Sequence, residues 1–494
     1  MRAFAAILLL AFVASSGCIG DGDDTSTTQP PAAQPGYALD CAISNWEEPC
    51  LARASPNNAT SKAEVDVAVN PTNPDNVFVA SKDTDPLASD GCVWAVGQST
   101  MDGGRTWKTT YVGGKTADRQ PGDLLYGWKC ITDPILAFGP DGTLYYSLQV
   151  YQASPRTGPL AGLPIETGGI MVTAVSHDGG ATFPDMVVLH AGDNNYVFHD
   201  YMHMGASPTT GTVFTVWNQL TLATIPALGA VAGESIPVLV AVEKGSDTAR
   251  PPVYLVRRDG SPSPPNLDAS LGESSLVVGA DGTVYAFLGG FNSPNAAYLS
   301  TSTDDGMTFT EPTRVFGFTP MDPMSNVSFR HGTVVELAVD NSAGGQGCLH
   351  AVWGGKEEGT VGPSDVYARR SCDKGATWTE PVLVNANTRG DGQWMPRVSV
   401  DGRGTVHAVY LTRHYGEPFV DAEHAWSTDN GTTWRTERLT ATSFDGDLGI
   451  HQDGFPFLGD YIGIASTGDV TYMGFPSTVT GRAEIAVAKT AWHD

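Results

Sequence analysis

The sequence has few basic residues and, beyond its first segment, no long apolar run. It holds 28 Lys and Arg against 54 Asp and Glu, which gives a formal net charge of −26. A chain of this charge repels phosphate backbones, which excludes nucleic acid as an expected partner. No apolar run reaches the length of about 18 residues that a membrane-spanning helix needs. An exported or otherwise water-exposed acidic protein is the class that remains.

Metal-binding and helical patterns are also missing. There is no CxxC pair and no His spacing typical of a zinc site, so no metal ligands and no cofactor are expected. The acidic loop 445–454 carries oxygen ligands without EF-hand spacing, which leaves calcium there as the alternative. No long amphipathic helical segment occurs. The 57 Gly and 33 Pro residues instead favour many short strands joined by tight turns.

The N-terminus predicts export. After Met1 and Arg2, residues 3–14 are continuously apolar, as in the core of a signal peptide. The residues Ser15, Ser16, Gly17 and Cys18 follow, and small residues ending at a Cys resemble a lipobox. We therefore expect a signal peptide over 1–18, lipidation of Cys18 and a flexible tether over 19–45. The protein would be anchored to the outer face of the cell membrane through lipid only, the alternative being an ordinary signal peptide cut nearby.

The cysteine count agrees with an oxidising compartment. Of seven Cys, six remain after Cys18, and an even number is typical of disulfide-bonded exported proteins. Chain order suggests three bridges: Cys41–Cys50, Cys92–Cys130 and Cys348–Cys372. Fifteen pairings of six Cys are possible, and the sequence does not select among them.

An eight-residue pattern recurs five times along the chain. It reads Ser/Thr, any residue, Asp, any, Gly, any, Thr, aromatic, and its copies are TMDGGRTW (100–107), SHDGGATF (176–183), STDDGMTF (302–309), SCDKGATW (371–378) and STDNGTTW (427–434). Asp and Gly favour a tight turn in which the carboxylate accepts local backbone N–H groups. The pattern resembles the Asp-box, or BNR repeat, of sialidase-like β-propellers. There it lies opposite the binding face, so its Asp residues are expected to be structural.

The spacing of the copies counts structural units. They start 76, 126, 69 and 56 residues apart, and the long interval is twice 63, which predicts a unit without the motif around 204–245. Apolar hairpins around Gly turns accompany each copy, for example 135–148, 277–288 and 398–411. We predict an all-β propeller over 46–494 with seven blades, six being the alternative. Residues 50–60 are the candidate fourth strand of the last blade.

A propeller of this kind binds its ligand where the innermost strands begin, around the central channel. The residues at those positions are Arg119, Asp133, His199, Asp200, Glu273, Arg330, His331, Trp394, Arg397, Asp460 and Tyr461. Arg can hold a carboxylate, and Trp or Tyr can stack on a sugar ring. Of these, Asp460 stands out because it is a charge within the otherwise apolar segment FLGDYIG.

The family resemblance implies a mechanism for some of these residues. Segments 394–401 and 457–465 also resemble exo-α-sialidase-like proteins, whose sialidase members use three Arg, a Tyr nucleophile with a Glu, and an Asp acid/base. By residue type, the triad would be Arg119, Arg330 and Arg397, with Tyr461 as nucleophile and Asp460 and Asp133 as the acidic groups. The Phe-Arg-Ile-Pro segment that carries the first Arg in that family is absent here. Three hypotheses follow: a cell-surface sialidase-like glycan hydrolase, a non-catalytic propeller that binds a glycan or surface protein, and an assembly-factor propeller.

Overall fold

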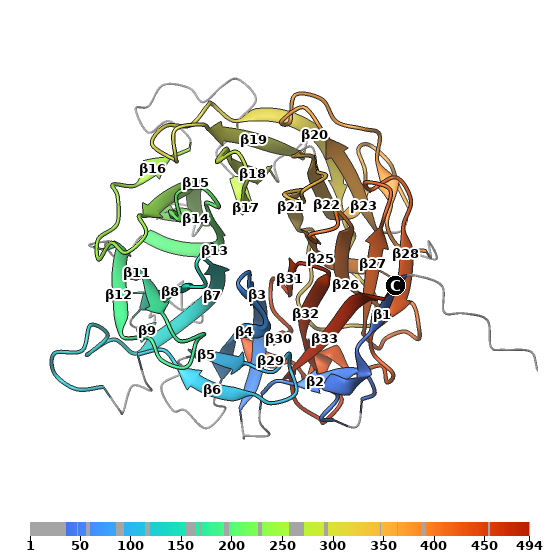
Figure 1. The fold of residues 1–494 in the computed structure, drawn as a ribbon, viewed down its shortest axis with the longest axis horizontal. Coiled ribbons are helices and arrows are strands. Elements are labelled where there is room, and N and C mark those ends of the chain that lie inside the picture. The colour runs from blue at the N-terminus through green and yellow to red at the C-terminus, as the bar shows by residue number, and fades with distance from the viewer. Residues whose placement is uncertain are drawn as a thin grey trace, which may run out of the picture.

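The computed structural model describes residues 36–493 except 47, 56–59, 85–92, 114–118, 152, 155–164, 167–168, 192–196, 226–229, 256–270, 291–294, 346, 363, 387–391 and 453–454. Within these ranges the regular elements are β-strands and short 3₁₀ turns such as η1 (Cys41–Ile43) and η4 (Gly446–Leu448). Antiparallel sheets follow one another around a ring (Figure 1). The protein is therefore an all-β propeller, as the sequence predicts. In the part of the chain described here, no helix is long and apolar enough to cross a membrane.

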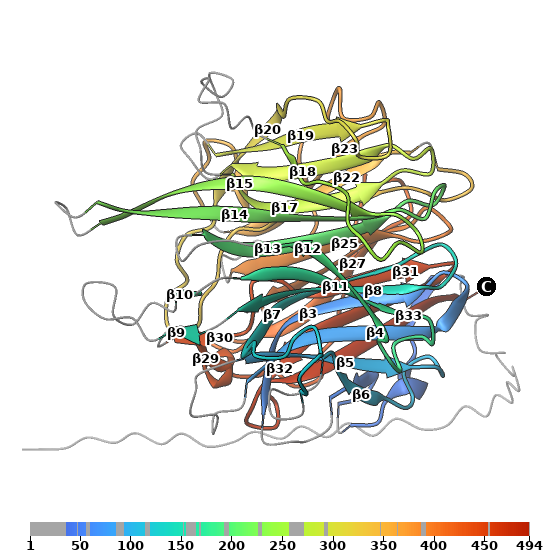
Figure 2. The same ribbon diagram turned by 90° about the vertical axis from the view of Figure 1, so that its left-hand side faces the viewer.

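The described strands group into units of four antiparallel strands, each starting with its innermost strand. The first three are β3 (Ser61–Asn70), β4 (Asn73–Thr84), β5 (Val93–Thr100) and β6 (Lys108–Tyr111); β7 (Cys130–Phe138), β8 (Leu144–Tyr151), β11 (Ile170–Ser176) and β12 (Asp185–His190); and β13 (Val197–Ala206), β14 (Val213–Ile225), β15 (Ala230–Val242) and β16 (Val253–Tyr254). In Figure 2, β14 and β15 extend beyond the body of the ring.

Three further units and a closing sheet complete the ring. They are β17 (Leu271–Val278), β18 (Val284–Gly290), β19 (Ala296–Ser302) and β20 (Thr313–Pro320); β21 (Val335–Val339), β22 (Leu349–Glu357), β23 (Asp365–Ser371) and β24 (Val382–Leu383); and β25 (Gln393–Val400), β26 (Val406–Thr412), β27 (Asp421–Ser427) and β28 (Arg435–Arg438). The closing sheet holds β31 (Gly463–Thr467), β32 (Val470–Ser477) and β33 (Glu484–His493). Two small hairpins, β9 (Ala153–Ser154) with β10 (Ile165–Glu166) and β29 (Ile450–Gln452) with β30 (Phe455–Phe457), stand apart.

The hydrophobic core lies between neighbouring units. For example, Phe78 of the first unit packs edge-on against Tyr146 and Phe183 of the second, with ring centroids 5.6 Å apart in each pair. Each junction around the ring, including the one between the last sheet and the first, has its own buried cluster. Both faces of every sheet are thereby covered. Burying one such large side chain contributes on the order of 1.5–3 kcal/mol.

The N-terminal segment closes the ring. The strands β1 (Gly36–Leu39) and β2 (Leu51–Arg53) both pair with β33 and supply the outer edge of the last sheet. The predicted strand near 50–60 is thus found at its start. The predicted tether over 19–45 is corrected at its C-terminal end, because 36–43 belong to the folded domain; residues 19–35, like the signal segment and Cys18, lie outside the described residues.

Two of the three suggested disulfides are present. Cys41 is bonded to Cys50, which links the segment after β1 to the start of β2, and Cys348 is bonded to Cys372 within the fifth unit. Cys130 is also disulfide-bonded. Its expected partner, Cys92, lies outside the described residues.

All five octapeptides form the same turn. In the first, Asp102 Oδ1 accepts the backbone N–H of Thr106 at 2.9 Å and Oδ2 accepts the Thr106 hydroxyl at 2.6 Å. The same carboxylate–hydroxyl bond of 2.6 Å recurs at Asp178, Asp304, Asp373 and Asp429. These hydrogen bonds lower the pKa of Asp304 and Asp373 to about 2. The Asp residues are therefore occupied by the turn, as the sequence predicts. We call this side of the ring the octapeptide face.

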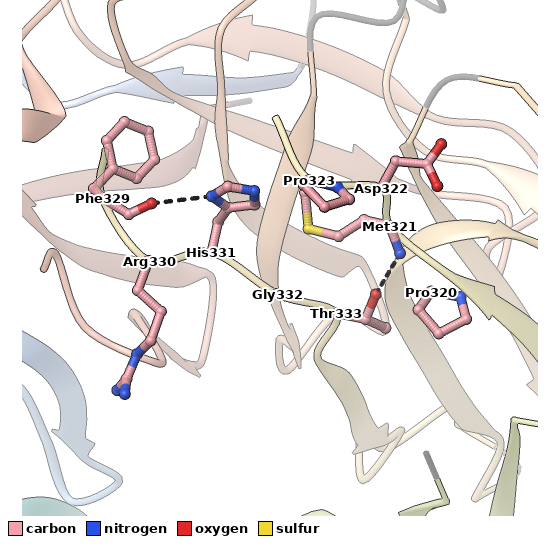
Figure 3. A pocket seen from close by; sticks show the side chains of 9 residues that line it. All are labelled: Pro320, Met321, Asp322, Pro323, Phe329, Arg330, His331, Gly332 and Thr333. Carbon is pink, nitrogen blue, oxygen red and sulfur yellow. Dashed lines mark hydrogen bonds between the residues drawn. The ribbon is translucent and has the colours of Figure 1, made fainter. Parts of the chain in front are cut away.

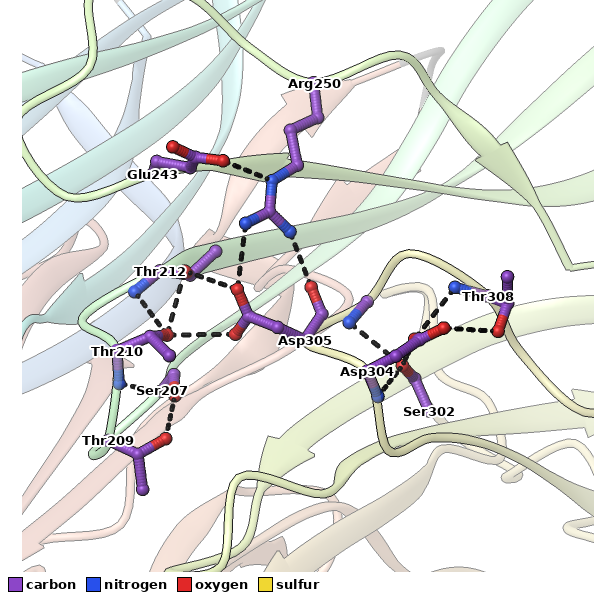
Figure 4. A network of polar contacts seen from close by, with 11 residues as sticks. Ser207, Thr209, Thr210, Thr212, Glu243, Arg250, Ser302, Asp304, Asp305 and Thr308 are labelled. Carbon is purple, nitrogen blue, oxygen red and sulfur yellow. Dashed lines mark hydrogen bonds and ion pairs between the residues drawn. The ribbon is translucent and has the colours of Figure 1, made fainter.

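The third unit, which lacks the octapeptide, is tied to the fourth by another polar network (Figure 4). Arg250 donates to Glu243 Oε1 at 3.0 Å and to Asp305 Oδ2 at 2.8 Å. The hydroxyls of Thr210 and Thr212 donate to the same Asp305 carboxylate at 2.9 Å each. The unit predicted without its motif is thus present, and an inter-unit ion pair joins it to its neighbour on the octapeptide face.

Candidate functional site

Four innermost strands carry the same backbone bulge where they begin. Glu64, Asp133, Tyr201 and Met395 all have φ between 50° and 53°, and the pairing register of each strand shifts at that point. A non-Gly residue in this left-handed region is uncommon and costs about 1–3 kcal/mol. Bulges re-aim side chains. These bulges lie on the face of the ring opposite the octapeptides, which we call the mouth.

Six charged side chains meet at the mouth: Glu64, Lys82, Asp133, Asp200, Arg330 and Asp460, which we call the mouth cluster. Lys82 Nζ lies 2.7 Å from Glu64 Oε2 and 3.6 Å from Asp133 Oδ1. Arg330 forms an ion pair with Asp460. Glu64 and Lys82 are almost fully buried, whereas the Asp460 side chain is 34% exposed. The cluster therefore runs from the interior to the open rim.

Four carboxyl groups share only two cations in this cluster, and the pKa values of Glu64, Asp200 and Asp460 are raised. Burial, together with the neighbouring Asp133 and Asp460, raises the pKa of Asp200 to about 8. Burial also raises the pKa of Asp460, although Arg330 and Lys82 oppose the shift. The pKa of Glu64 is raised well above its ordinary value by burial against the opposing effect of Lys82. A pKa of about 8 favours the protonated form of Asp200 at neutral pH, next to the Asp460 carboxyl that pairs with Arg330.

Phe457 forms a common wall for the two cations. The Arg330 guanidinium lies 4.2 Å from the centroid of the Phe457 ring, and Lys82 Nζ lies 5.4 Å from it. Cation–π contacts of this kind hold a charged group in place without consuming its hydrogen bonds. Arg330 therefore keeps donors for Asp460 and for a ligand at the rim.

A second cluster fills the channel below the mouth. Arg397 Nη1 lies 2.5 Å from Glu336 Oε1, and its Nη2 lies 3.4 Å from Asp66 Oδ1. His203 Nδ1 accepts the Leu276 backbone N–H at 3.2 Å, so its proton is on Nε2, 3.5 Å from Glu336. These residues line a cavity of about 340 Å³ reached by the innermost strands of every unit. Arg397 is thus already paired with two buried carboxylates.

The structure brings several predicted site residues together. Asp133, Asp200, Arg330 and Asp460 are members of the mouth cluster, as described above. Tyr461 lies directly beneath them, but its hydroxyl donates to the carbonyl oxygen of Pro134 at 3.0 Å. Burial, with Glu64 and Asp133 nearby, raises the pKa of Tyr461 well above its ordinary value. The phenol is therefore disfavoured as a nucleophile, because its ionised form is destabilised.

Other predicted ligand-binding residues serve the fold. Arg119 donates to the carbonyl oxygens of Gly113 and Trp128 at 3.0 and 2.5 Å, within its own loop. His199 Nδ1 accepts the Trp217 indole N–H at 2.9 Å in a buried position. These two contacts fix loop and core, which corrects the expectation that both side chains face the mouth.

Trp394 and His331 also have contacts within the protein that occupy their side chains. Trp394 is fully buried and stacks on Phe329 with ring centroids 5.6 Å apart, so its face is covered by protein. His331 Nε2 accepts the Met324 backbone N–H at 2.8 Å, and its Nδ1 lies 3.0 Å from the Phe329 carbonyl oxygen. The expected sugar-stacking Trp is therefore a core residue. The expected Arg triad is not supported either. Arg119 donates to carbonyl oxygens of its own loop, Arg397 pairs with buried carboxylates in the channel, and Arg330 pairs with Asp460 at the rim. The side chain of Glu273 lies outside the described residues.

Glu64 and Lys82, which form the innermost ion pair of the mouth, were not among the site residues expected from the sequence. Both lie within strands that are largely buried. Charged residues at buried strand positions require partners. The alternation of Lys62, Glu64 and Asp66 in β3 was the signal that could have identified this site.

A pocket of about 520 Å³ adjoins the mouth cluster (Figure 3). It lies in the connection between β20 and β21 and is lined by Pro320, Met321, Asp322, Pro323, Phe329, Arg330, His331, Gly332 and Thr333. In Figure 3 the Arg330 side chain extends away from the other lining residues. Since its guanidinium pairs with Asp460, Arg330 belongs to both the pocket and the mouth cluster.

The described residues place no group of three or more His, Cys, Asp and Glu side chains for a metal ion. In the acidic loop considered for calcium, Asp447 Oδ1 instead accepts the backbone N–H groups of Ser328 and Phe329 at 2.9 and 3.1 Å. Asp445 caps η4 by accepting the Asp447 N–H at 2.9 Å. These two carboxylates therefore hold the loop.

No protein-family model matches the chain, and no curated protein matches it. Similar solved structures include a protein of unknown function from Dyadobacter fermentans, with 14% identity, a TM-score of 0.47 and coverage of 93% of this chain and 100% of that one. A Hadza microbial sialidase has 14% identity and a TM-score of 0.42 over 83% and 76% of the two chains. An ulvan lyase of polysaccharide lyase family 25 has 12% identity and a TM-score of 0.47 over 87% and 94%. Likenesses this distant indicate neither substrate nor reaction.

Proposed function

We propose that the mouth cluster cleaves a glycosidic bond, with Asp200 as the proton donor. The observation that carries the proposal is the buried position of Asp200 in the mouth cluster, where burial and the neighbouring Asp133 and Asp460 raise its pKa to about 8. Glycosidic cleavage by carboxyl groups needs one protonated and one ionised group at the same pH. The mouth cluster supplies this combination at neutral pH, where the saccharide can reach it from the open rim.

Each member of the cluster has a role in this proposal. The Asp200 proton passes to the glycosidic oxygen as the bond to the anomeric carbon breaks, and a water molecule forms the new bond to that carbon and gives its proton to the Asp460 carboxylate. Asp460, whose ionised form Arg330 favours, faces the positive charge that develops on the sugar ring. Lys82 holds the buried carboxylates of Glu64 and Asp133 and limits their repulsion. Asp460 and Asp133 keep the acidic roles expected from the sequence, and Asp200 moves from ligand binding to proton donation.

A sialidase mechanism through Tyr461 has less support. The Tyr461 hydroxyl is bonded to Pro134, and two of the three expected Arg side chains are committed elsewhere. A sialoside remains one of the saccharides to be tested, with carboxyl rather than phenol chemistry.

The test is a panel of 4-methylumbelliferyl glycosides that includes neutral sugars, uronides and a sialoside, assayed from pH 4 to 9. We expect turnover of at least one glycoside, and a loss of about 100-fold or more in Asp200→Asn. Asp185→Asn is the matched control, because Asp185 is 64% exposed on an outer strand. Folded wild-type protein that turns over no member would contradict the proposal.

A second candidate is a non-catalytic propeller that binds a glycan or surface protein or acts as an assembly factor. The exposed side chains of Tyr415, Phe419 and Leu448, which are 39%, 45% and 44% exposed, favour it. Tyr415 and Phe419 lie between β26 and β27, and Leu448 lies in η4, between β28 and β29. Binding to a glycan array or surface protein with no turnover, unchanged by Asp200→Asn, would support this alternative.

We further propose a lipid-anchored, exported protein with seven blades, namely the six four-stranded units and the closing sheet. Gly36 pairs with His493 at the end of the last sheet that belongs to the octapeptide face. A tether from Cys18 would therefore join the ring on that face, with the mouth directed away from the membrane. Cys18→Ser removes the lipid anchor. We therefore expect the exported variant in the aqueous fraction, whereas the wild-type protein is in the membrane fraction.

A further inference from the structure

The pocket beside the mouth cluster offers an apolar surface to a ligand. Its lining includes Pro320, Met321, Pro323 and Phe329. Phe329 is held from its other side by the buried Trp394, with which it stacks at an interplanar angle of 23°. The wall is thus backed by core packing. Proline rings carry no N–H donor, so this side of the pocket presents mainly carbon atoms.

The polar side chains of the lining already have partners. The Thr333 hydroxyl accepts the Met321 backbone N–H at 2.8 Å. Both nitrogens of His331 face backbone groups, as described above. Asp322 Oδ2 pairs with Lys356 Nζ at 2.6 Å. A sugar ring placed here would leave most of its hydroxyl groups without partners, which costs free energy.

Arg330 joins this apolar surface to the mouth cluster. Arg330 is one of the residues that line the pocket, and its guanidinium pairs with Asp460. A ligand whose saccharide lies at Asp200 and Asp460 can therefore place a neighbouring apolar group in the pocket. The cavity of about 520 Å³ is within the usual size of small-molecule sites and exceeds the needs of a single methyl group.

We propose that this pocket binds an aryl substituent carried by the saccharide. The position of the saccharide in this inference rests on the proposed function, whereas binding of the aryl group rests on the pocket itself. A flat ring suits Pro and Met walls, since Met sulfur and aliphatic C–H groups make favourable contacts with aromatic faces. The substrate class is thus an aryl-substituted glycan, with the ring beyond Arg330 and the reacting bond at the mouth cluster.

Gly332 provides a selective probe of the pocket. A Cβ at Gly332 would meet no atom within 4 Å, and the residue does not have a left-handed φ, so a larger side chain is accepted without strain. We expect Gly332→Trp to place its ring in the pocket and to leave the fold intact. Gly344→Trp is the matched control, because Gly344 also has open space around its Cβ and lies in the turn between β21 and β22 on the octapeptide face.

The experiment has a binding arm and a turnover arm. In the first, N-phenyl-1-naphthylamine is titrated into the folded protein, and its fluorescence is expected to saturate at one site per chain. Gly332→Trp should weaken this binding at least tenfold, and Gly344→Trp should leave it unchanged, with thermal unfolding confirming both folds. Probe fluorescence that does not saturate, or equal probe affinity in the two variants, would contradict the aryl pocket regardless of the result for turnover.

In the second arm, methyl and 4-methylumbelliferyl glycosides of the same sugar are compared. We expect a KM at least tenfold lower for the aryl glycoside in wild-type protein and in Gly344→Trp, and equal values in Gly332→Trp. Equal KM values in wild type would contradict the proposed placement of the ring. Selective probe binding without turnover of any glycoside would instead retain the pocket and refute the proposed function.

Discussion

The hydroxyl of Tyr461 donates a hydrogen bond to the carbonyl oxygen of Pro134 at 3.0 Å, across the top of the central channel. Pro134 follows Asp133, whose left-handed backbone turns the chain at this point. The bond therefore joins the last innermost strand of the ring to the second. It gives Tyr461 a structural role where a sialidase-like mechanism would need an activated phenol.

Replacing Tyr461 by Phe should have a small effect on catalysis. The substitution removes one buried hydrogen bond, so the free energy of unfolding should fall by about 1 kcal/mol. Turnover should stay within a few-fold of wild type, because the proposed acid is Asp200. Denaturant unfolding and steady-state kinetics check both expectations. A loss of 100-fold or more in a stable Tyr461→Phe protein would restore Tyr461 as the nucleophile.

Lys82 should be a major determinant of stability. Its side chain is 4% exposed and its ammonium pairs with Glu64, so Lys82→Met leaves a buried carboxylate without its cation. Breaking such a pair costs about 3–5 kcal/mol. Combining Lys82→Met with Glu64→Gln should recover most of that loss, as urea unfolding of the three variants would measure. Equal stability of the single and double variants would show that the pair is not coupled.

Acid should destabilise the fold through two buried histidines. Burial lowers the pKa of His350 and His407 to about 4, below the ordinary value near 6.5. Both are therefore neutral in the folded protein and become charged on unfolding, so the stability they contribute is present above pH 6.5 and lost as pH falls toward 4. Each contributes up to about 1.4 kcal/mol per pH unit. Unfolding free energies of wild type and His350→Asn between pH 7 and 4.5 test this, and an identical pH slope for both would contradict it.

Asp200 should give the opposite pH dependence of stability. Its raised pKa means that the folded state binds this proton more tightly than the unfolded chain does between about pH 4 and 8. Stability from this group therefore falls as pH rises through that range. Asp200→Asn should remove the effect and make the protein more stable than wild type at pH 8.5. Destabilisation by Asp200→Asn at that pH would show that the ionised carboxylate is favourably held.

The Cys348–Cys372 disulfide should stabilise the fifth unit. Its cysteines are 24 residues apart in the sequence, and a loop of that size corresponds to about 3 kcal/mol in the chain-entropy model. Cys348→Ser with Cys372→Ser should lower the unfolding free energy by that amount without changing the glycoside profile. An unchanged melting temperature would show that the bridge constrains little of the unfolded chain.

The fold was largely predictable because its signals are local. Asp and Gly at fixed positions specify the turn at Asp102 and its four repeats, and Gly turns between apolar runs specify the hairpins. The strand β1 was missed because Gly36–Leu39 follows a segment rich in Pro, Gln and Thr, and its pairing partner β33 is more than 400 residues away. The composition of a segment does not indicate which distant strand it pairs with.

The candidate site was predictable only in part. The start of an innermost strand is recognisable in the sequence, so Asp133, Asp200, Arg330 and Asp460 were found. The direction of a side chain at that position depends on a bulge and on packing, and this is why His199 and Trp394 face the core. Lys82 was missed because it is on a second strand, and it reaches Glu64 across the sheet only through the register shift in β3.

The most direct test of the proposed chemistry is the titration of the Asp200 carboxyl by carbon-13 NMR, comparing wild-type protein with Asp200→Asn. We predict one Asp carboxyl signal that titrates near pH 8 and is absent from the variant. A set of Asp signals that all titrate below pH 6 would contradict a protonated Asp200 at neutral pH, and with it the assignment of this residue as the acid of the mouth cluster.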